Sequence, residues 1–315
     1  MATYATVVVR GEDERQAERT AAAVRAVFDR VERAMSNWSP DSELSRLNRD
    51  AASGPYRIQD EGLASCVERA LGGAAATGGA FDPTVGPLMT LWGFRPRAPR
   101  VPEDPEIAEA MTRVGARRVT YDPATRTIRF ARDGMEIDLG GIAKGCALDE
   151  ARHAVSGVEV DLDLGGQWAF QGGGRRRTGI ADPFARDRSL GEVAADPADS
   201  IATSSDSENH FEAGGKSYGH VMDPRTGRPA ATDVVQATVL DPSATTAEVL
   251  GKALMVVGSA NAGALLRSFP KARAILVVRE GERLAVLASP ALSGRLSLVP
   301  DGRFAADSPR MLTPP

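Results

Sequence analysis

The chain is organised around the stretch Asp138-Leu139-Gly140-Gly141-Ile142-Ala143-Lys144-Gly145-Cys146-Ala147-Leu148-Asp149-Glu150-Ala151. The apolar run Met135-Glu136-Ile137 predicts the end of a strand before it, and apolar residues at helical spacing predict a helix after it. Paired glycines let the backbone at such a turn approach a ligand closely, and free N–H groups at the start of a helix favour an anion. The stretch therefore predicts a phosphate site at a strand-turn-helix, or else an ordinary connection that happens to contain glycines.

A lysine in this stretch favours the phosphate interpretation. Only four of the 38 basic residues are lysines, and they are Lys144, Lys216, Lys252 and Lys271. Lys144, one turn into the predicted helix, would add a compact positive charge in a chain that otherwise uses arginine. The carboxylates of Asp138 and Asp149 could bind sugar hydroxyls or hold a cation beside it.

The composition is that of a globular protein. With 315 residues, of which 42% are hydrophobic, the chain can bury a large core in one domain or two coupled lobes. A net charge of −4 gives no basic field for nucleic acid, and no apolar run is long enough to span a membrane. The N-terminus lacks the regions of a signal peptide, so we expect a cytoplasmic protein. Cys66 and Cys146 are then expected to be reduced thiols and not a disulfide.

The order of elements predicts an α+β fold with an antiparallel-rich sheet, because strands and helices are mixed without strict βαβ alternation. Helices are expected over 13–35, 59–77, 106–114, 246–257 and 261–269, and strands over 4–9, 118–121, 127–130, 158–164, 201–206, 234–240, 273–278 and 284–287. Residues 35–48, 77–88 and 95–105 are expected to be loops or connectors. We expect one domain over 1–315, with the motifs in about 35–258 and a tail over 303–315.

Other residues are ambiguous on pattern alone. Trp38, in a polar loop, could stack on a ligand ring or dock onto the core. His220 is expected on a short strand, where a histidine is more often structural than catalytic. Gly165-Gly166 is a second glycine pair after an aspartate-bearing strand, which suggests two backbones converging on one ligand. Glu248 and Lys252 have the i, i+4 spacing of an ordinary surface pair on a helix.

Several motifs, taken together and in order, resemble the signatures of the ApbE family. They are Met35-Ser36-Asn37-Trp38 with Ser42-Glu43-Leu44-Ser45-Arg46-Leu47-Asn48, Gly79-Ala80-Phe81-Asp82-Pro83-Thr84-Val85-Gly86-Pro87-Leu88, Asp138-Leu139-Gly140-Gly141-Ile142-Ala143-Lys144-Gly145, Leu164-Gly165-Gly166 and His220 through Gly227. Members of this family are FAD:protein FMN transferases. The resemblance implies a T-fold-like α+β architecture with two tightly coupled lobes, FAD in the cleft between them and a magnesium ion (Mg2+) at the pyrophosphate. The family reaction moves the FMN half of FAD to a Ser or Thr hydroxyl of a partner protein and releases AMP.

The resemblance also implies a set of site residues. Contacts with the cofactor are implied for Met35, Trp38, Phe81, Asp82, Thr84, Gly140, Gly141, Lys144, Asp149, Gly165, Gly166 and His220. His220 would lie near the reacting phosphate as a proton acceptor or orienter, with Asp206 and Lys252 completing the catalytic set. Ala143 would offer a backbone carbonyl to the metal, and Glu248 its carboxylate. Splitting a pyrophosphate depends mainly on positioning and on neutralising charge, for which these residues are suitable.

The sequence departs from the family pattern at the metal-binding helix. The family helix reads Ala-Asp-Ala-Leu-x-Thr-Ala, with Asp and Thr as magnesium ligands, whereas this chain has Ala247-Glu248-Val249-Leu250-Gly251-Lys252-Ala253. Lys252 offers three donors and no acceptor, so its ammonium would repel the ion or replace it. In the second case Lys252 should lie near Glu248 and the Gly140–Ala143 turn, and the alternative is that it points to solvent. The family pattern Thr-Ser-Gly-Asp-Tyr is also altered, to Thr203-Ser204-Ser205-Asp206-Ser207.

Three functions remain open at this point. The first is a flavin transferase that tolerates Glu248 and uses Lys252 as a partial replacement for metal, with an acceptor flavoprotein as its partner. The second is a flavoprotein that keeps FAD intact as a redox cofactor for a small-molecule oxidoreductase or monooxygenase reaction. The third is a non-catalytic flavin carrier. The family resemblance favours the first, and the lysine at position 252 favours the second.

Overall fold

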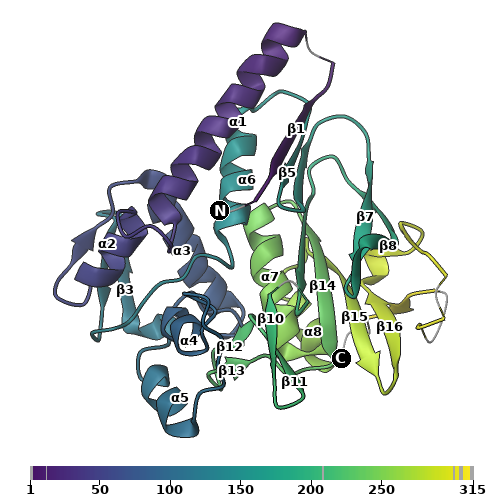
Figure 1. Ribbon diagram of the computed structural model, residues 1–315. Helices are drawn as coiled ribbons and strands as arrows, with labels where there is room; N and C mark the ends of the chain where they lie inside the picture. The colour runs from purple at the N-terminus through teal and green to yellow at the C-terminus, as the bar shows by residue number, and fades with distance from the viewer. Residues whose placement is uncertain (1–2, 12, 208, 301, 305–307, 313–315) are drawn as a thin grey trace.

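The computed structural model describes residues 3–11, 13–207, 209–300, 302–304 and 308–312. Its largest sheet has eight strands in the order β1-β5-β6-β9-β14-β15-β16-β18. These are β1 (Ala5–Val9), β5 (Val160–Leu164), β6 (Gln167–Gln171), β9 (Ser200–Ser205), β14 (Val234–Asp241), β15 (Arg273–Glu280), β16 (Arg283–Ala288) and β18 (Arg310–Met311). Neighbouring strands are antiparallel except β16 and β18, which are parallel. The predicted antiparallel-rich α+β fold is confirmed (Figure 1).

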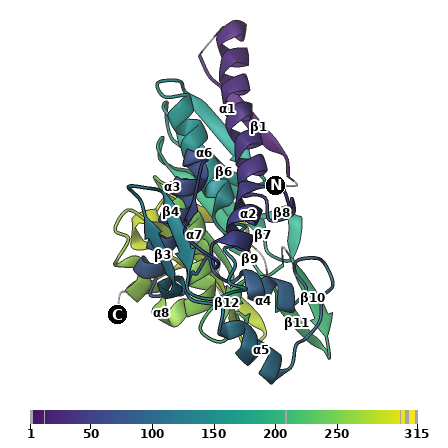
Figure 2. The ribbon, with the colours of Figure 1, turned by 90° about the vertical axis from the view of Figure 1, so that its left-hand side faces the viewer.

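Helices cover one face of this sheet (Figures 1 and 2). α7 (Ala244–Val257) packs on β9 and β14, α6 (Ala143–Ala154) packs on β5 and β6, and α1 (Glu14–Met35) packs on α6. α3 (Glu61–Ala76) contacts all three of these helices, and α8 (Ser259–Leu266) follows α7 and contacts β15. The apolar stripe predicted for α1 faces this core, because its residues at positions 24, 28, 31 and 35 are all buried.

A smaller sheet covers the opposite face, near the yellow end of the chain in Figure 1. It consists of β7 (Arg176–Asp182), β8 (Ala185–Ala195) and β17 (Leu296–Leu298). Strand β15 shows how the two cores are separated: Ile275 and Val277 pack toward the small sheet, whereas Leu276 and Val278 pack toward the helices. This alternation follows from the period of two in a strand.

The remaining elements gather at one end of the helical layer. They are the helices α2 (Glu43–Asp50), α4 (Gly86–Leu91), α5 (Asp104–Met111) and η1 (Ala116–Arg118), the sheet of β2 (Tyr56–Arg57), β4 (Thr127–Phe130) and β3 (Val119–Asp122), and the pairs β10 (His210–Ala213) with β11 (Lys216–Gly219) and β12 (Met222–Asp223) with β13 (Arg228–Pro229). The short helix η2 (Pro290–Leu292) is the exception, because its Leu292 packs in the core of the small sheet. Tyr218 lies 5.5 Å from Trp92 and 5.2 Å from Phe211 between ring centroids. These rings fix the hairpin that leads into His220.

Three local predictions are wrong. The run Met135–Ile137 is buried but belongs to no strand, because the Asn48 side chain takes the place of a strand partner and bonds the N–H and the carbonyl of Ile137 at 2.9 Å each. The loop predicted over 35–48 contains the start of α2, whose N-cap is Ser42. The tail predicted over 303–315 contributes β18 and the buried Leu312, while 305–307 and 313–315 lie outside the described residues.

The prediction of reduced thiols is also wrong. Cys66 of α3 and Cys146 of α6 form a disulfide with a Cα–Cα distance of 5.9 Å across 80 positions of sequence. The two helices pack against each other, and residues so far apart in sequence give no sign of this contact. Among the described residues, no helix combines the length and apolar character needed to cross a bilayer.

Candidate functional site

Two adjoining cavities open beside the start of α6. The outer cavity encloses about 290 Å3 beside the end of α1, and the inner cavity encloses about 180 Å3 beside α7. Met89, Asp138, Gly140 and Lys144 line both, so the two spaces meet at the predicted glycine turn. Small-molecule sites are typically concave spaces of this kind with a few convergent polar groups.

The glycine turn leads directly into α6. The Leu139 carbonyl accepts the N–H groups of Ile142 at 2.9 Å and Ala143 at 2.7 Å, and the N–H of Gly140 donates to Asp138 at 2.7 Å. Gly140 is exposed, and Gly141 is half-buried. A Cβ on Gly141 would lie 3.5 Å from the Phe81 ring, so a ligand can approach this backbone more closely than a larger side chain would allow.

One N–H group at the start of α6 already contacts an anion of the chain itself. Gly145 N–H donates to Oε2 of Glu248 at 2.8 Å, and Glu248 is fully buried. A Cβ on Gly145 would lie 2.6 Å from the Ala244 carbonyl, so glycine is required for α6 and α7 to approach this closely. The helix start therefore stabilises a carboxylate of α7.

Lys252 contacts the other oxygen of this carboxylate. Its Nζ lies 3.2 Å from Oε1 of Glu248, and its side chain is 17% exposed. Burial opposes ionisation of Glu248, but the charges of Lys252 and Lys144, together with the Gly145 N–H, hold its pKa below the usual value. The prediction of an ordinary surface pair is therefore wrong, and so is the alternative in which Lys252 points to solvent.

These residues do not fit a magnesium ion. Each oxygen of Glu248 already has a hydrogen-bond donor, and Lys252 adds a cation where a ligand would be needed. Ala143 lines the outer cavity at the start of α6, while Glu248 and Lys252 line the inner one. Within the described residues, no three His, Cys, Asp or Glu side chains are grouped so that they could hold a metal.

His220 lies in a bend between β11 and β12 and not on a strand as predicted. It lines the inner cavity together with Lys252. Its N–H donates to the Asn209 carbonyl at 2.9 Å, and Nδ1 lies 3.2 Å from the same oxygen. This contact favours the tautomer with the proton on Nδ1, in which Nε2 has the lone pair that a proton acceptor needs.

Asp206 lies beside Gly219, the last residue of β11, and lines neither cavity. A Cβ on Gly219 would lie 2.7 Å from its Oδ1, an oxygen that has no hydrogen-bond partner among the described residues. Burial raises the pKa of Asp206 to about 6, and the charge of His210 opposes the shift. The predicted catalytic residue is therefore beside the segment that carries His220 and outside the cleft.

Of five further residues predicted to contact the cofactor, four line a cavity and one does not. Met35 and Trp38 line the outer cavity, where Trp38 is 65% exposed, and Phe81 and Asp82 line the inner cavity. Thr84 is fully buried and lines neither cavity. Its hydroxyl accepts the N–H of Gly115, which gives Thr84 a structural role and leaves its cofactor contact a prediction.

The second glycine pair does not converge on the same cavity. Gly165 and Gly166 form the turn between β5 and β6, with φ values of +63° and +83° that glycine adopts readily. Neither residue lines the outer or the inner cavity. Their connection to the site is indirect, because Asp163 accepts the N–H of Gly166 at 2.8 Å and interacts electrostatically with Lys144.

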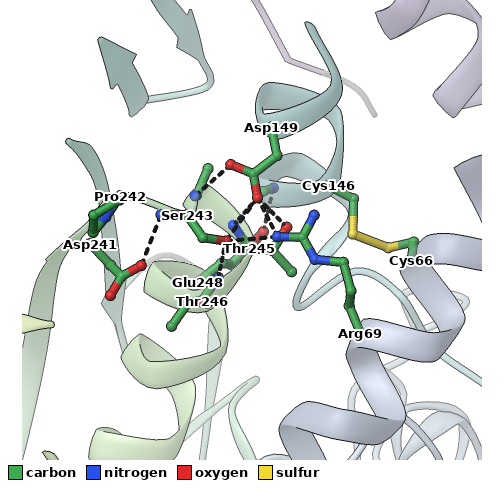
Figure 3. Close-up of polar contacts among 12 residues, drawn as sticks. Cys66, Arg69, Cys146, Asp149, Asp241, Pro242, Ser243, Thr245, Thr246 and Glu248 are labelled. Atoms are coloured by element: carbon green, nitrogen blue, oxygen red, sulfur yellow. Dashed lines mark hydrogen bonds and ion pairs between the residues drawn. A yellow bond between two sulfur atoms is a disulfide. The ribbon is translucent and has the colours of Figure 1, made fainter. Parts of the chain in front are cut away.

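Asp149 lines neither cavity, and its side chain points toward Arg69 and the start of α7 (Figure 3). Its contact with the nucleotide stays a prediction. Asp149 accepts hydrogen bonds from the start of α7, including the N–H of Ala244 at 2.8 Å and the hydroxyl of Thr245 at 2.8 Å, and it pairs with Arg69. Burial opposes ionisation, but Arg69 and these donors hold the pKa of Asp149 below its usual value. Asp149 thus fixes α7 to α6.

Sequence reasoning missed two charged residues of the outer cavity, Arg95 and Glu32. Arg95 lines the outer cavity, donates to Asp138 at 3.1 Å and pairs with Glu136. The connector 95–105 had suggested no chemistry, because nothing in its pattern indicates that its first residue folds back onto the glycine turn. Arg95 holds Asp138, the acceptor of the Gly140 N–H.

Comparison with known proteins identifies relatives over most of the chain. The model of the ApbE family matches residues 1–276. An FAD:protein FMN transferase of Vibrio cholerae serotype O1 is 36% identical over 74% of this chain and 71% of its own length, and that of Treponema pallidum is 33% identical over 91% and 85%. The ApbE protein of Thermotoga maritima has a TM-score of 0.79 at 28% identity, covering 93% of this chain and 99% of its own. The flavin transferase ApbE of Vibrio cholerae has a TM-score of 0.78 at 28% identity, covering 94% and 96%.

Proposed function

The chain belongs to the ApbE family, and we propose that it is an FAD:protein FMN transferase, which moves the FMN half of FAD to a Ser or Thr hydroxyl of a partner protein and releases AMP. The observation that carries the proposal is the junction of the two cavities, where the Gly140-Gly141 turn meets Lys144. His220 and Lys252 line the same inner cavity. This arrangement combines backbone access, positive charge and a proton acceptor at one point.

In this proposal FAD extends through both cavities. The isoalloxazine or its neighbourhood contacts Met35 and Trp38 in the outer cavity, whose exposed indole offers a flat apolar surface. The pyrophosphate lies at the glycine turn beside Lys144, whose ammonium neutralises part of its charge. The remaining contacts of the nucleotide come from the inner cavity, where Phe81 and Asp82 lie.

The transfer step uses groups of this chain. The acceptor hydroxyl oxygen forms a bond to the phosphorus of the FMN half, and the bond from that phosphorus to the bridging oxygen breaks. Nε2 of His220 takes the hydroxyl proton, and AMP leaves with the bridging oxygen. The ammonium groups of Lys144 and Lys252 stabilise the charge that develops on the phosphate oxygens.

The proposal is tested by incubating the purified protein with FAD, with and without magnesium, and measuring AMP by chromatography. Sustained release of AMP, together with FMN bound covalently to an acceptor protein that carries Ser or Thr, is the expected result. His220→Ala should lower the rate of release. FAD that binds tightly and is recovered intact after denaturation would contradict the proposal.

A second candidate is favoured by the pair of Glu248 and Lys252. Because a cation, Lys252, contacts Glu248 where a metal ligand would be needed, the site is also compatible with a flavoprotein that keeps FAD intact as a redox cofactor for a small-molecule reaction. That protein would be purified with a flavin absorption spectrum that responds to a chemical reductant and would release no AMP.

A further inference from the structure

We propose that Lys252 takes the place of a divalent cation in this chain, so that FAD binds to the protein without a metal. The inference rests on the proposed function only in its assignment of FAD to the two cavities. It concerns the charge that receives the pyrophosphate and not the identity of the acceptor.

The first argument is the set of donors that already contact Glu248. Its two oxygens accept from different donors, Gly145 N–H at 2.8 Å and Lys252 Nζ at 3.2 Å. A metal ligated by this fully buried carboxylate would either lie beside the Lys252 ammonium or displace it. The first arrangement places two cations together, and the second leaves an ammonium without its partner beside a divalent charge.

The second argument is the position of the ammonium arm. A Cβ built on Gly141 would lie 3.6 Å from Cε and 3.9 Å from Cδ of Lys252, so this side chain packs against the glycine turn. Lys252 and Gly141 both line the inner cavity. The end of the lysine is therefore at the place where the proposed pyrophosphate approaches the backbone.

The third argument is the balance of charge around the inner cavity. Lys144 and Lys252 contribute two ammonium groups, while Glu248 contributes one carboxylate. Asp138 also lines the cavity, but Arg95 pairs with it at 3.1 Å. Asp82 adds a further carboxylate, so the formal charges of these groups, with Arg95 included, sum to zero. A divalent ion would therefore not be drawn in by a net negative charge, and the ammonium groups of Lys144 and Lys252 are the local positive charge available to a pyrophosphate at the glycine turn.

The choice of lysine agrees with this role. Lysine is rare in this chain, and an ammonium is a compact point charge with three donors, whereas a guanidinium is a broad planar fork. The Lys252 side chain contacts the Glu248 carboxylate and packs against the glycine turn at the same time.

The test is a titration of the full-length protein with FAD, followed by flavin fluorescence, in excess EDTA and in excess Mg2+. We expect the two dissociation constants to agree within about twofold. In EDTA, Lys252→Thr should weaken binding by about 10- to 100-fold, as expected for loss of a charge-assisted hydrogen bond. Lys271→Thr, which removes an exposed lysine by the same substitution, should leave the affinity unchanged.

Two further variants keep the test decisive if Lys252→Thr folds poorly. Lys252→Arg retains a cation and should still bind FAD equally well in EDTA and in magnesium. The double variant Glu248→Asp with Lys252→Thr should bind FAD at least about tenfold more tightly in magnesium than in EDTA, because it frees a carboxylate and adds a hydroxyl ligand.

The outcomes separate this inference from the proposed function. If magnesium tightens FAD binding by the unmodified protein tenfold or more, the inference is overturned while the proposed function stands. If the protein binds no FAD in either condition, both are overturned.

Discussion

The backbone N–H of Gly145 donates to Glu248 at 2.8 Å, which joins the first turn of α6 to the middle of α7 inside the core. The bond explains why a helix start that the sequence predicts to hold a phosphate has no need of one for its own stability. It also makes the carboxylate a structural group as well as a neighbour of the cleft.

Glu248→Ala should destabilise the protein by about 3 kcal/mol, because it leaves the half-buried Lys252 ammonium and the Gly145 N–H without their shared acceptor. Urea unfolding followed by circular dichroism measures the loss. The exposed Glu282→Ala is the matched control and should change the unfolding free energy by less than about 0.5 kcal/mol. Equal stability of the two variants would contradict a structural role for the bond.

Lys144→Ala should weaken FAD binding by about 10- to 100-fold, because Lys144 lines both cavities and supplies charge at their junction. Fluorescence titration gives the dissociation constant. Lys216→Ala, on the exposed strand β11, serves as the control. An unchanged affinity for Lys144→Ala would mean that the pyrophosphate lies elsewhere.

Asp149→Asn should lower the unfolding free energy by about 2 to 4 kcal/mol at pH 7. The pKa of Asp149 is lowered in the folded protein, so its ionised form adds stability above its unfolded pKa of about 3.9, and that stability is lost as the pH falls below this value. The difference between the variant and the unmodified protein should therefore shrink toward pH 3. Asp41→Asn, at an exposed position, should show no such convergence in parallel denaturation curves.

Asp206→Asn should have the opposite pH dependence. Burial raises the pKa of Asp206 to about 6, so the fold favours its protonated form and loses stability as the pH rises from about 4 to about 6. The variant should be more stable than the unmodified protein by about 1 to 3 kcal/mol at pH 8 and equally stable at pH 4. Melting temperatures of the variant and the unmodified protein at the two pH values, with Asp187→Asn as control, test this prediction. A variant less stable at pH 8 would show that the carboxylate is favoured in the fold.

Replacing Cys66 and Cys146 by serine should cost about 2 to 4 kcal/mol, since the bond closes a loop across 80 positions. A reducing agent should lower the melting temperature of the unmodified protein and leave that of the double variant unchanged. Thiol titration of the unfolded, unreduced protein should detect no free cysteine. Two titratable thiols would restore the expectation of reduced cysteines.

The sequence predicted the parts of the fold that depend on local periodicity. The core face of α1 was identified from the spacing of its apolar residues, and the glycine turn of 138–145 was found from its two glycines and its lysine. Both signals are contained within a few turns of chain. The place of Lys252 beside Glu248 also followed from the i, i+4 spacing on one helix.

Several of the failures have a different origin, because they depend on a distant partner. Asn48 replaces a strand for Ile137. Cys66 meets Cys146 only after α3 and α6 have packed. A local sequence pattern does not indicate which distant residues come into contact in the fold.

The scarcity of lysine gives this protein an unusually simple amine chemistry. Lys216 and Lys271 are exposed, whereas Lys144 and Lys252 are half-buried in the cleft. An amine-acylating reagent should therefore label two of the four lysines quickly and two slowly, and a bound flavin should shield only the slow pair. Mass spectrometry of four peptides can then report occupancy of the cleft in a mixture, without any spectroscopic signal from the ligand.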